Sequence, residues 1–69
     1  MKEDEIREYL LVNGWREFND KTGYFRRNPL ELVILTTDNI SYWEDIRAIS
    51  TRCKFDLPIS FEDLRNLLL

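Results

Sequence analysis

The spacing of hydrophobic side chains predicts a helix near the start of the chain. Ile6, Tyr9 and Leu10 follow one another at intervals of three and one residues, so that all three share one helical face. Acidic side chains precede them, where the helix dipole stabilises negative charge. Gly14 can adopt the left-handed conformation that commonly ends a helix. We therefore expect a helix over residues 3–13 that stops at Gly14.

A strand-like alternation of apolar and polar residues follows this helix. It predicts strands over 15–18 and 24–27, joined by a turn over 19–23 that is rich in Asn, Asp and Gly. A third strand is expected over 30–37, and it carries hydrophobic side chains on both of its faces. Such a strand is either central and covered on both sides, or part of a sheet whose second face contacts a partner.

Residues 40–53 admit two interpretations. Residues 40–43 form a fourth strand if Asp38-Asn39 makes a hairpin turn. Alternatively, Ser41 caps a helix, and Glu44 completes a Ser-x-x-Glu capping box. We favour the helix, because the hydrophobic residues that follow have helical spacing: Tyr42, Ile46, Ile49 and Cys53.

The end of the chain predicts one more helix. Residues 54–59 alternate like a strand, but Pro58 limits them to an edge strand or an extended linker. Ser60 then matches the cap of a final helix over 61–69. The whole pattern predicts one α+β domain over residues 1–69, with an N-terminal helix, a three-stranded antiparallel meander and two C-terminal helices packed on one sheet face.

Composition argues against an enzyme. The 69 residues include no histidine and a single cysteine, Cys53, and the formal net charge is −3. The commonest general base and the commonest metal ligand are therefore absent. Neighbouring carboxylates such as Glu44 and Asp45 are explained by first helical turns rather than by a catalytic pair. We expect no catalytic residues, no metal site and no cofactor.

The same composition points to a binding partner. A chain of 69 residues forms a small core, and a single cysteine cannot close an internal disulfide that would reinforce it. A protein partner or a homodimer is the expected supplement. An unpaired thiol, an acidic start without an apolar leader and the lack of a run of about 20 apolar residues indicate a cytoplasmic protein with no membrane span.

The leading hypothesis is a protein–protein interface built from hydrophobic residues that the core leaves uncovered. In the helix interpretation, Trp43 lies off the buried stripe and beside Arg47, where it suits an interface anchor. The third strand and the last helical turn carry further apolar residues. The predicted interface consists of Trp43, Arg47, Val33, Leu35, Leu68 and Leu69.

The alternative hypothesis is single-stranded nucleic-acid binding by the hairpin over 15–27. Aromatic side chains stack on bases and arginines hold phosphates, and this hairpin alternates the two kinds of residue. Its predicted contacts are Arg16, Lys21, Tyr24, Arg26 and Arg27. A simpler interpretation places Tyr24 or Phe25 in the core and pairs the arginines with Glu17, Asp20 or Glu31. The negative total charge makes nucleic acid the less favoured partner.

Overall fold

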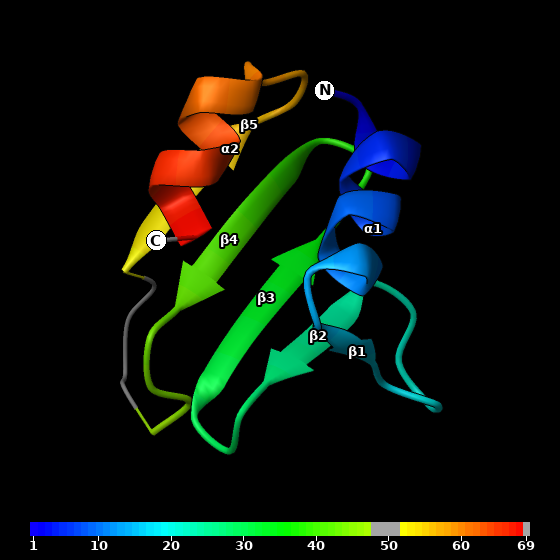
Figure 1. Cartoon of the computed structure of the whole chain (residues 1–69), viewed down its shortest axis with the longest axis vertical. Helices are drawn as coiled ribbons and strands as arrows, with labels where there is room; N and C mark the ends of the chain where they lie inside the picture. The colour runs from blue at the N-terminus through cyan, green and yellow to red at the C-terminus, as the bar shows by residue number, and fades with distance from the viewer. Residues whose placement is uncertain (48–51, 69) are drawn as a thin grey trace.

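The structure is a computed structural model that describes residues 1–47 and 52–68. Its elements, in chain order, are α1 (Glu3–Val12), β1 (Arg16–Glu17), β2 (Tyr24–Arg27), β3 (Glu31–Leu35), β4 (Asn39–Trp43), β5 (Cys53–Asp56) and α2 (Phe61–Leu68). The five strands form one antiparallel sheet in the order β1-β2-β3-β4-β5. Both helices lie on the same face of this sheet (Figure 1).

The prediction of three strands and two C-terminal helices is wrong, because β4 occupies the start of the segment assigned to the first of those helices, and β5 adds a fifth strand to the sheet. The turn before β4 explains the difference. The Thr36 hydroxyl accepts hydrogen bonds from the N–H groups of Asp38 and Asn39 at 3.3 and 3.1 Å. This closed turn sends the chain back antiparallel to β3, so Ser41 lies inside a strand rather than at a helix start. Ile49, which supported the helix, lies outside the described residues.

The pairing of β4 with β3 on one side and β5 on the other shows that it is a strand. Ile40 and Tyr42 are 0% and 4% exposed and contribute to the core, whereas Trp43 points to the other face of the sheet and is half-buried. β5 pairs with β4 at the edge of the sheet, and Pro58 follows it. Of the two interpretations of residues 54–59, the edge strand therefore holds for the first part of the segment.

The end of the first helix at Gly14 and the start of the last helix at Ser60 are confirmed. Gly14 has a φ of 91°, and the Trp15 N–H donates to the Leu10 carbonyl at 3.0 Å, which is the bond of a Schellman helix end. At α2, the Ser60 hydroxyl accepts the N–H of Asp63 at 3.1 Å. Ser60 is therefore the cap of α2, as its place in the sequence predicts.

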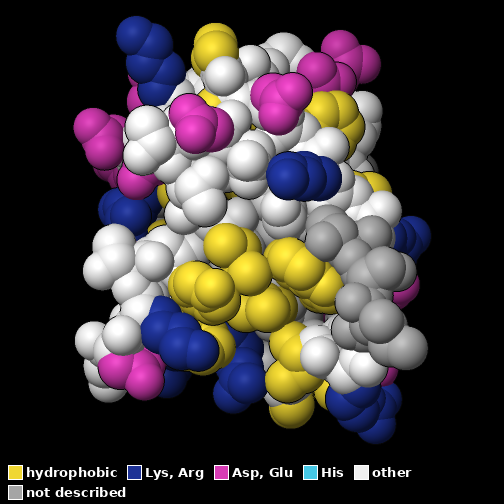
Figure 2. All heavy atoms as spheres, turned by 180° about the vertical axis from the view of Figure 1, so that it is seen from behind, with side chains coloured by type: hydrophobic (Ala, Val, Ile, Leu, Met, Phe, Trp, Pro, Cys, Tyr) yellow, Lys and Arg dark blue, Asp and Glu magenta, His cyan; other side chains and the backbone are white. Residues whose placement is uncertain are grey.

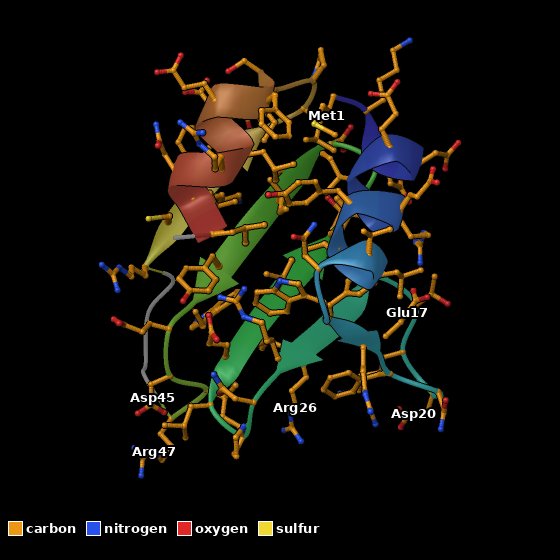
Figure 3. The ribbon with its side chains drawn as sticks, viewed as in Figure 1. Met1, Glu17, Asp20, Arg26, Asp45 and Arg47 are labelled. Atoms are coloured by element: carbon orange, nitrogen blue, oxygen red, sulfur yellow. The ribbon has the colours of Figure 1, made fainter. Side chains whose placement is uncertain are left out.

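The core lies between the two helices and the sheet (Figure 3). The helices bury Ile6, Leu10, Leu64, Leu67 and Leu68. The sheet and the residue before β1 bury Trp15, Phe25, Val33, Leu35, Ile40 and Tyr42 against them. Because both helices pack on one side, the described part of the chain leaves the opposite face of the sheet without a covering layer.

Candidate functional site

The surface of the sheet opposite the helices, which we call the open face, is the candidate site. In β3, Glu31, Val33 and Leu35 are buried toward the helices, so Leu32 and Ile34 point to the open face, where they are half-buried. Figure 2 looks onto this side of the molecule and shows a continuous hydrophobic patch in its middle, with Lys and Arg side chains near its lower margin. Hydrophobic patches with a polar border mark contact surfaces.

Strand register gathers the hydrophobic residues of the open face. Tyr24 pairs with Ile34, and Leu32 pairs with Trp43. Phe18 joins them, because its N–H donates to the Tyr24 carbonyl at 2.8 Å and the two ring centroids lie 6.0 Å apart. We call these five residues the apolar patch. Each of them is half-buried, so part of each side chain is exposed to solvent.

Two cations lie directly over aromatic rings of the apolar patch. The Arg26 guanidinium is 5.3 Å from the ring centroid of Phe18, and the Lys21 ammonium is 5.3 Å from that of Tyr24. Cations at this distance are attracted to the negative face of the ring. The positive charge of the hairpin is therefore held against the apolar patch, and it covers a face of both rings.

The charges of the open face are unbalanced. Its strand positions carry three cations, Arg16, Arg26 and Lys54, and one carboxylate, Asp56. Within the described residues, neither these three cations nor Lys21 forms an ion pair. The paired arginines lie elsewhere: Arg7, Arg27, Arg47 and Arg52. The strand positions of the open face thus carry more positive than negative charge, although the chain as a whole carries a net charge of −3. Asp and Glu side chains also lie on this side of the molecule, above the apolar patch and at its lower left (Figure 2).

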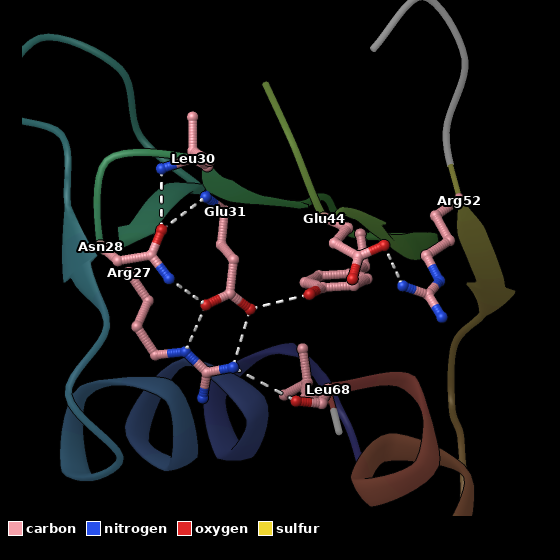
Figure 4. A network of polar contacts seen from close by, with 8 residues as sticks. Arg27, Asn28, Leu30, Glu31, Glu44, Arg52 and Leu68 are labelled. Carbon is pink, nitrogen blue, oxygen red and sulfur yellow. Dashed lines mark hydrogen bonds and ion pairs between the residues drawn. The ribbon is translucent and has the colours of Figure 1, made fainter. Parts of the chain in front are cut away.

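Arg27, the fifth predicted nucleic-acid contact, points to the helix side of the sheet. Its guanidinium donates to the two carboxylate oxygens of Glu31 at 3.0 and 2.8 Å and to the Leu68 carbonyl at 3.4 Å (Figure 4). Glu31 also accepts hydrogen bonds from the Tyr42 hydroxyl at 2.7 Å and the Asn28 amide at 2.6 Å. This network joins the β2–β3 turn, β4 and α2, and so it stabilises the fold.

The same network shifts three pKa values, and it raises that of Arg27 through the hydrogen bond to Glu31. The Arg27 hydrogen bonds are the main cause that lowers the pKa of Glu31, with a smaller contribution from Tyr42. Burial, and then the hydrogen bond to the Glu31 carboxylate, raises the pKa of Tyr42 to about 12. A hollow of about 650 Å³ lies beside these two groups. Because they bond to each other, both are already engaged, and neither is poised for acid–base chemistry in the hollow.

The predicted protein-interface residues divide between the open face and the core. Trp43 lies on the open face, although strand alternation rather than a helical position places it there. Val33, Leu35 and Leu68 are 0%, 3% and 6% exposed and belong to the core, so they are not accessible to a partner in this fold. Leu69 lies outside the described residues.

Arg47, the remaining predicted interface residue, lies in the turn after β4. It forms an ion pair with Asp45 at 2.7 Å, away from Arg26 of β2 (Figure 3). Hydrogen bonds from Arg47 lower the pKa of Asp45 to about 2. Arg47 is therefore already paired within its own turn.

Sequence reasoning missed three members of the apolar patch: Phe18, Leu32 and Ile34. The signal for Leu32 and Ile34 is in the sequence, because the third strand has two hydrophobic faces. The sequence pattern alone does not say which of the two faces the helices cover. Phe18 belongs to the alternation of aromatic and basic residues in the hairpin over 15–27, and its hydrogen bond to Tyr24 places it beside that residue.

No protein family, curated protein or solved structure matches the chain. Residues 1–47 and 52–68 contain no group of three or more His, Cys, Asp or Glu side chains that is placed to hold a metal ion. In this same part of the chain, neither helix is long and apolar enough to cross a membrane. The function of the open face is therefore argued from its own geometry.

Proposed function

We propose that this chain is a non-enzymatic protein-binding module and that the open face is its binding surface. The observation that carries the proposal is the apolar patch, which α1 and α2 leave uncovered while they bury the opposite face of the sheet. A small domain with a limited core gains stability when a partner buries such a second face.

The composition of the open face supports this proposal. The cores of protein interfaces are rich in aromatic residues and arginine and poor in carboxylates. The open face combines Phe18, Tyr24 and Trp43 with Arg16 and Arg26. Trp43 is the proposed anchor, because tryptophans in packed surroundings dominate the binding energy of many interfaces.

Single-stranded nucleic-acid binding is the second candidate, and it uses the same surface. The favouring observation is that Arg26 and Lys21 lie beside the rings of Phe18 and Tyr24, as in sheet surfaces that hold phosphates and stack bases. However, the cations cover ring faces on which bases would stack, and Arg27 is engaged by Glu31. Protein binding accounts for more of the observed geometry.

Photo-cross-linking in the cells that make the protein tests the proposal. A benzophenone side chain replaces Ile34 on the open face in one variant and Val12, which is 78% exposed on α1, in the control variant. We expect a discrete protein adduct from position 34 and none from position 12. Adducts from position 12 alone, or none from either position, would contradict the proposal, and adducts with nucleic acid would support the second candidate.

Two further expectations from the sequence bear on this proposal. We propose that the protein acts in the cytoplasm, where the free thiol of Cys53 stays reduced. The homodimer expected from the sequence is not part of this proposal, and its test is given in the Discussion. It is supported by the uncovered apolar patch but opposed by the positive charge around it.

A further inference from the structure

Two arginines face each other on the open face. Strand register places Arg16 directly opposite Arg26, and like charges at such positions destabilise a sheet. Among the residues that the structure describes, neither arginine is in an ion pair, whereas Arg7 and Arg27 on the helix side are both neutralised by glutamates. This unfavourable pair of charges lies beside the apolar patch. Such a combination is typical of a surface that serves binding at some cost in stability.

We infer that the partner of the open face is a protein surface with an apolar centre and a border rich in carboxylates. This inference rests on the proposed protein-binding function and specifies the chemistry of the partner. Arg16 and Arg26 offer adjacent guanidinium groups, which bind carboxylates in a bidentate manner. Lys21 lies over the ring of Tyr24, the open-face position of β2 next to Arg26, and Lys54 lies across the apolar patch on β5. Carboxylates on both sides of an apolar centre therefore complement this surface.

A second copy of the chain does not supply this chemistry. On the strand positions of the open face, Asp56 is the one carboxylate against the cations Arg16, Arg26 and Lys54. Two open faces packed on each other would leave most of these cations without a carboxylate, and like charges brought together at an interface oppose binding. Charge complementarity favours a different, acidic protein.

Nucleic acid also complements the charge, but it fits the centre of the surface less well. Leu32 and Ile34 form the middle of the apolar patch, and they provide neither an aromatic plane for a base nor a hydrogen bond to its edge. Apolar side chains of a protein are the natural cover for such residues.

The test uses two short synthetic peptides and the full-length, isotopically labelled chain. Both peptides have the same phenylalanine and leucine residues, which alternate with glutamate in one peptide and with lysine in the other. Backbone-amide NMR follows each titration. We expect the glutamate peptide to shift amides of β2, β3 and β4 and to bind at least about tenfold more tightly than the lysine peptide, with an affinity that falls as salt rises.

Charge reversal provides the matched controls. Arg16→Glu should remove the preference for the glutamate peptide. Arg65→Glu reverses the same charge at an exposed position of α2 and should leave the preference unchanged. Lys21 lies in the turn between β1 and β2. If Arg16→Glu alters the fold, Lys21→Glu replaces it as the charge reversal that should weaken the preference for the glutamate peptide.

The outcomes separate this inference from the proposed function. Equal or tighter binding of the lysine peptide to the open face overturns the acidic partner and leaves protein binding in place. If a short oligothymidylate binds more tightly than the glutamate peptide, the partner is nucleic acid and the acidic-protein inference is wrong. If the chain forms a dimer whose contact amides lie on the open face, the partner is a second copy, and the inference is also wrong. Shifts confined to the helices, or no shifts with either peptide, contradict the proposed function as well.

Discussion

Replacing Gly23 by alanine should destabilise the fold much more than replacing Gly14, although both glycines have positive φ values, of 86° and 91°. An alanine at either position costs about 1 kcal/mol for its left-handed backbone. At Gly14 the added Cβ meets nothing within 4 Å. At Gly23 it would overlap the backbone carbonyl oxygen of Leu35, which lies in β3.

The overlap at Gly23 also disturbs two hydrogen bonds of the hairpin, one to β3 and one within the hairpin itself. The Leu35 N–H donates to the Gly23 carbonyl at 2.8 Å, and the Gly23 N–H donates to the Glu17 carboxylate at 2.9 Å. A neutral hydrogen bond contributes about 1 kcal/mol and one to a charged group about 2 kcal/mol. We therefore expect Gly23→Ala to lower the free energy of unfolding by about 3 kcal/mol or more, against about 1 kcal/mol for Gly14→Ala.

Urea unfolding of both variants, followed by circular dichroism, measures this difference. For a small domain with an m-value of about 1 kcal/mol per molar urea, the midpoint should fall by about 3 M for Gly23→Ala and about 1 M for Gly14→Ala. Equal effects of the two substitutions would refute the reasoning. They would show that Gly23 does not lie against β3, and hence that the β2–β3 register that builds the open face is wrong.

Three further predictions concern charge. The pKa of Tyr42 is raised from 10.0 to about 12, so the hydroxyl stabilises the fold fully below pH 10, and this stabilisation is lost as the pH rises toward 12. Urea melts across this range should therefore show an alkaline loss of stability in the wild type and none in Tyr42→Phe. Arg16→Glu should raise the stability by about 0.5 kcal/mol at low salt, because it places opposite charges across from each other with Arg26, and an unchanged or lower urea midpoint contradicts this. The like charges of two open faces oppose their packing, so light scattering should show a monomer near 8.4 kDa from micromolar to millimolar concentration. A dimer would contradict this and would confirm the homodimer expected from the sequence.

Local signals in the sequence predicted the elements that glycine, proline and capping residues delimit. Gly14 ends α1 and Ser60 begins α2 as expected, and β2 has the predicted bounds between the turn at Gly23 and Pro29. These residues act through local backbone geometry or, at Ser60, through a side-chain hydrogen bond to a residue three positions on, and both depend little on the rest of the fold. Such signals can therefore be found in a single sequence.

The error over residues 40–53 has a physical cause. Tyr42 and Ile46 have helical spacing, but they belong to different parts of the fold, since Tyr42 lies in β4 and Ile46 follows it, where its N–H donates to the Leu30 carbonyl. The pairing of β4 with β3 and of β5 with β4 provides the hydrogen bonds that outweigh this local pattern. Long-range pairing of this kind cannot be deduced from the spacing of side chains.

The candidate site was predicted in part for the same reason. Arg16, Lys21, Tyr24 and Arg26 were found by composition, and they do share the open face. Trp43 was assigned to a separate interface, because its pairing with Leu32 could not be foreseen from the helix interpretation. The structure brings Trp43 together with four of the five predicted nucleic-acid contacts on one surface.

The most direct test of the open face as a protein interface compares two affinities. The partner found by cross-linking is purified, and its binding to the wild type is compared with its binding to Trp43→Ala. Titration calorimetry should show a loss of about 2 kcal/mol, or about 30-fold in Kd, for Trp43→Ala. Phe61→Ala, which truncates an aromatic side chain that is 53% exposed on α2, should bind like the wild type. A folded Trp43→Ala variant with wild-type affinity, or an equal loss in Phe61→Ala, would contradict the account.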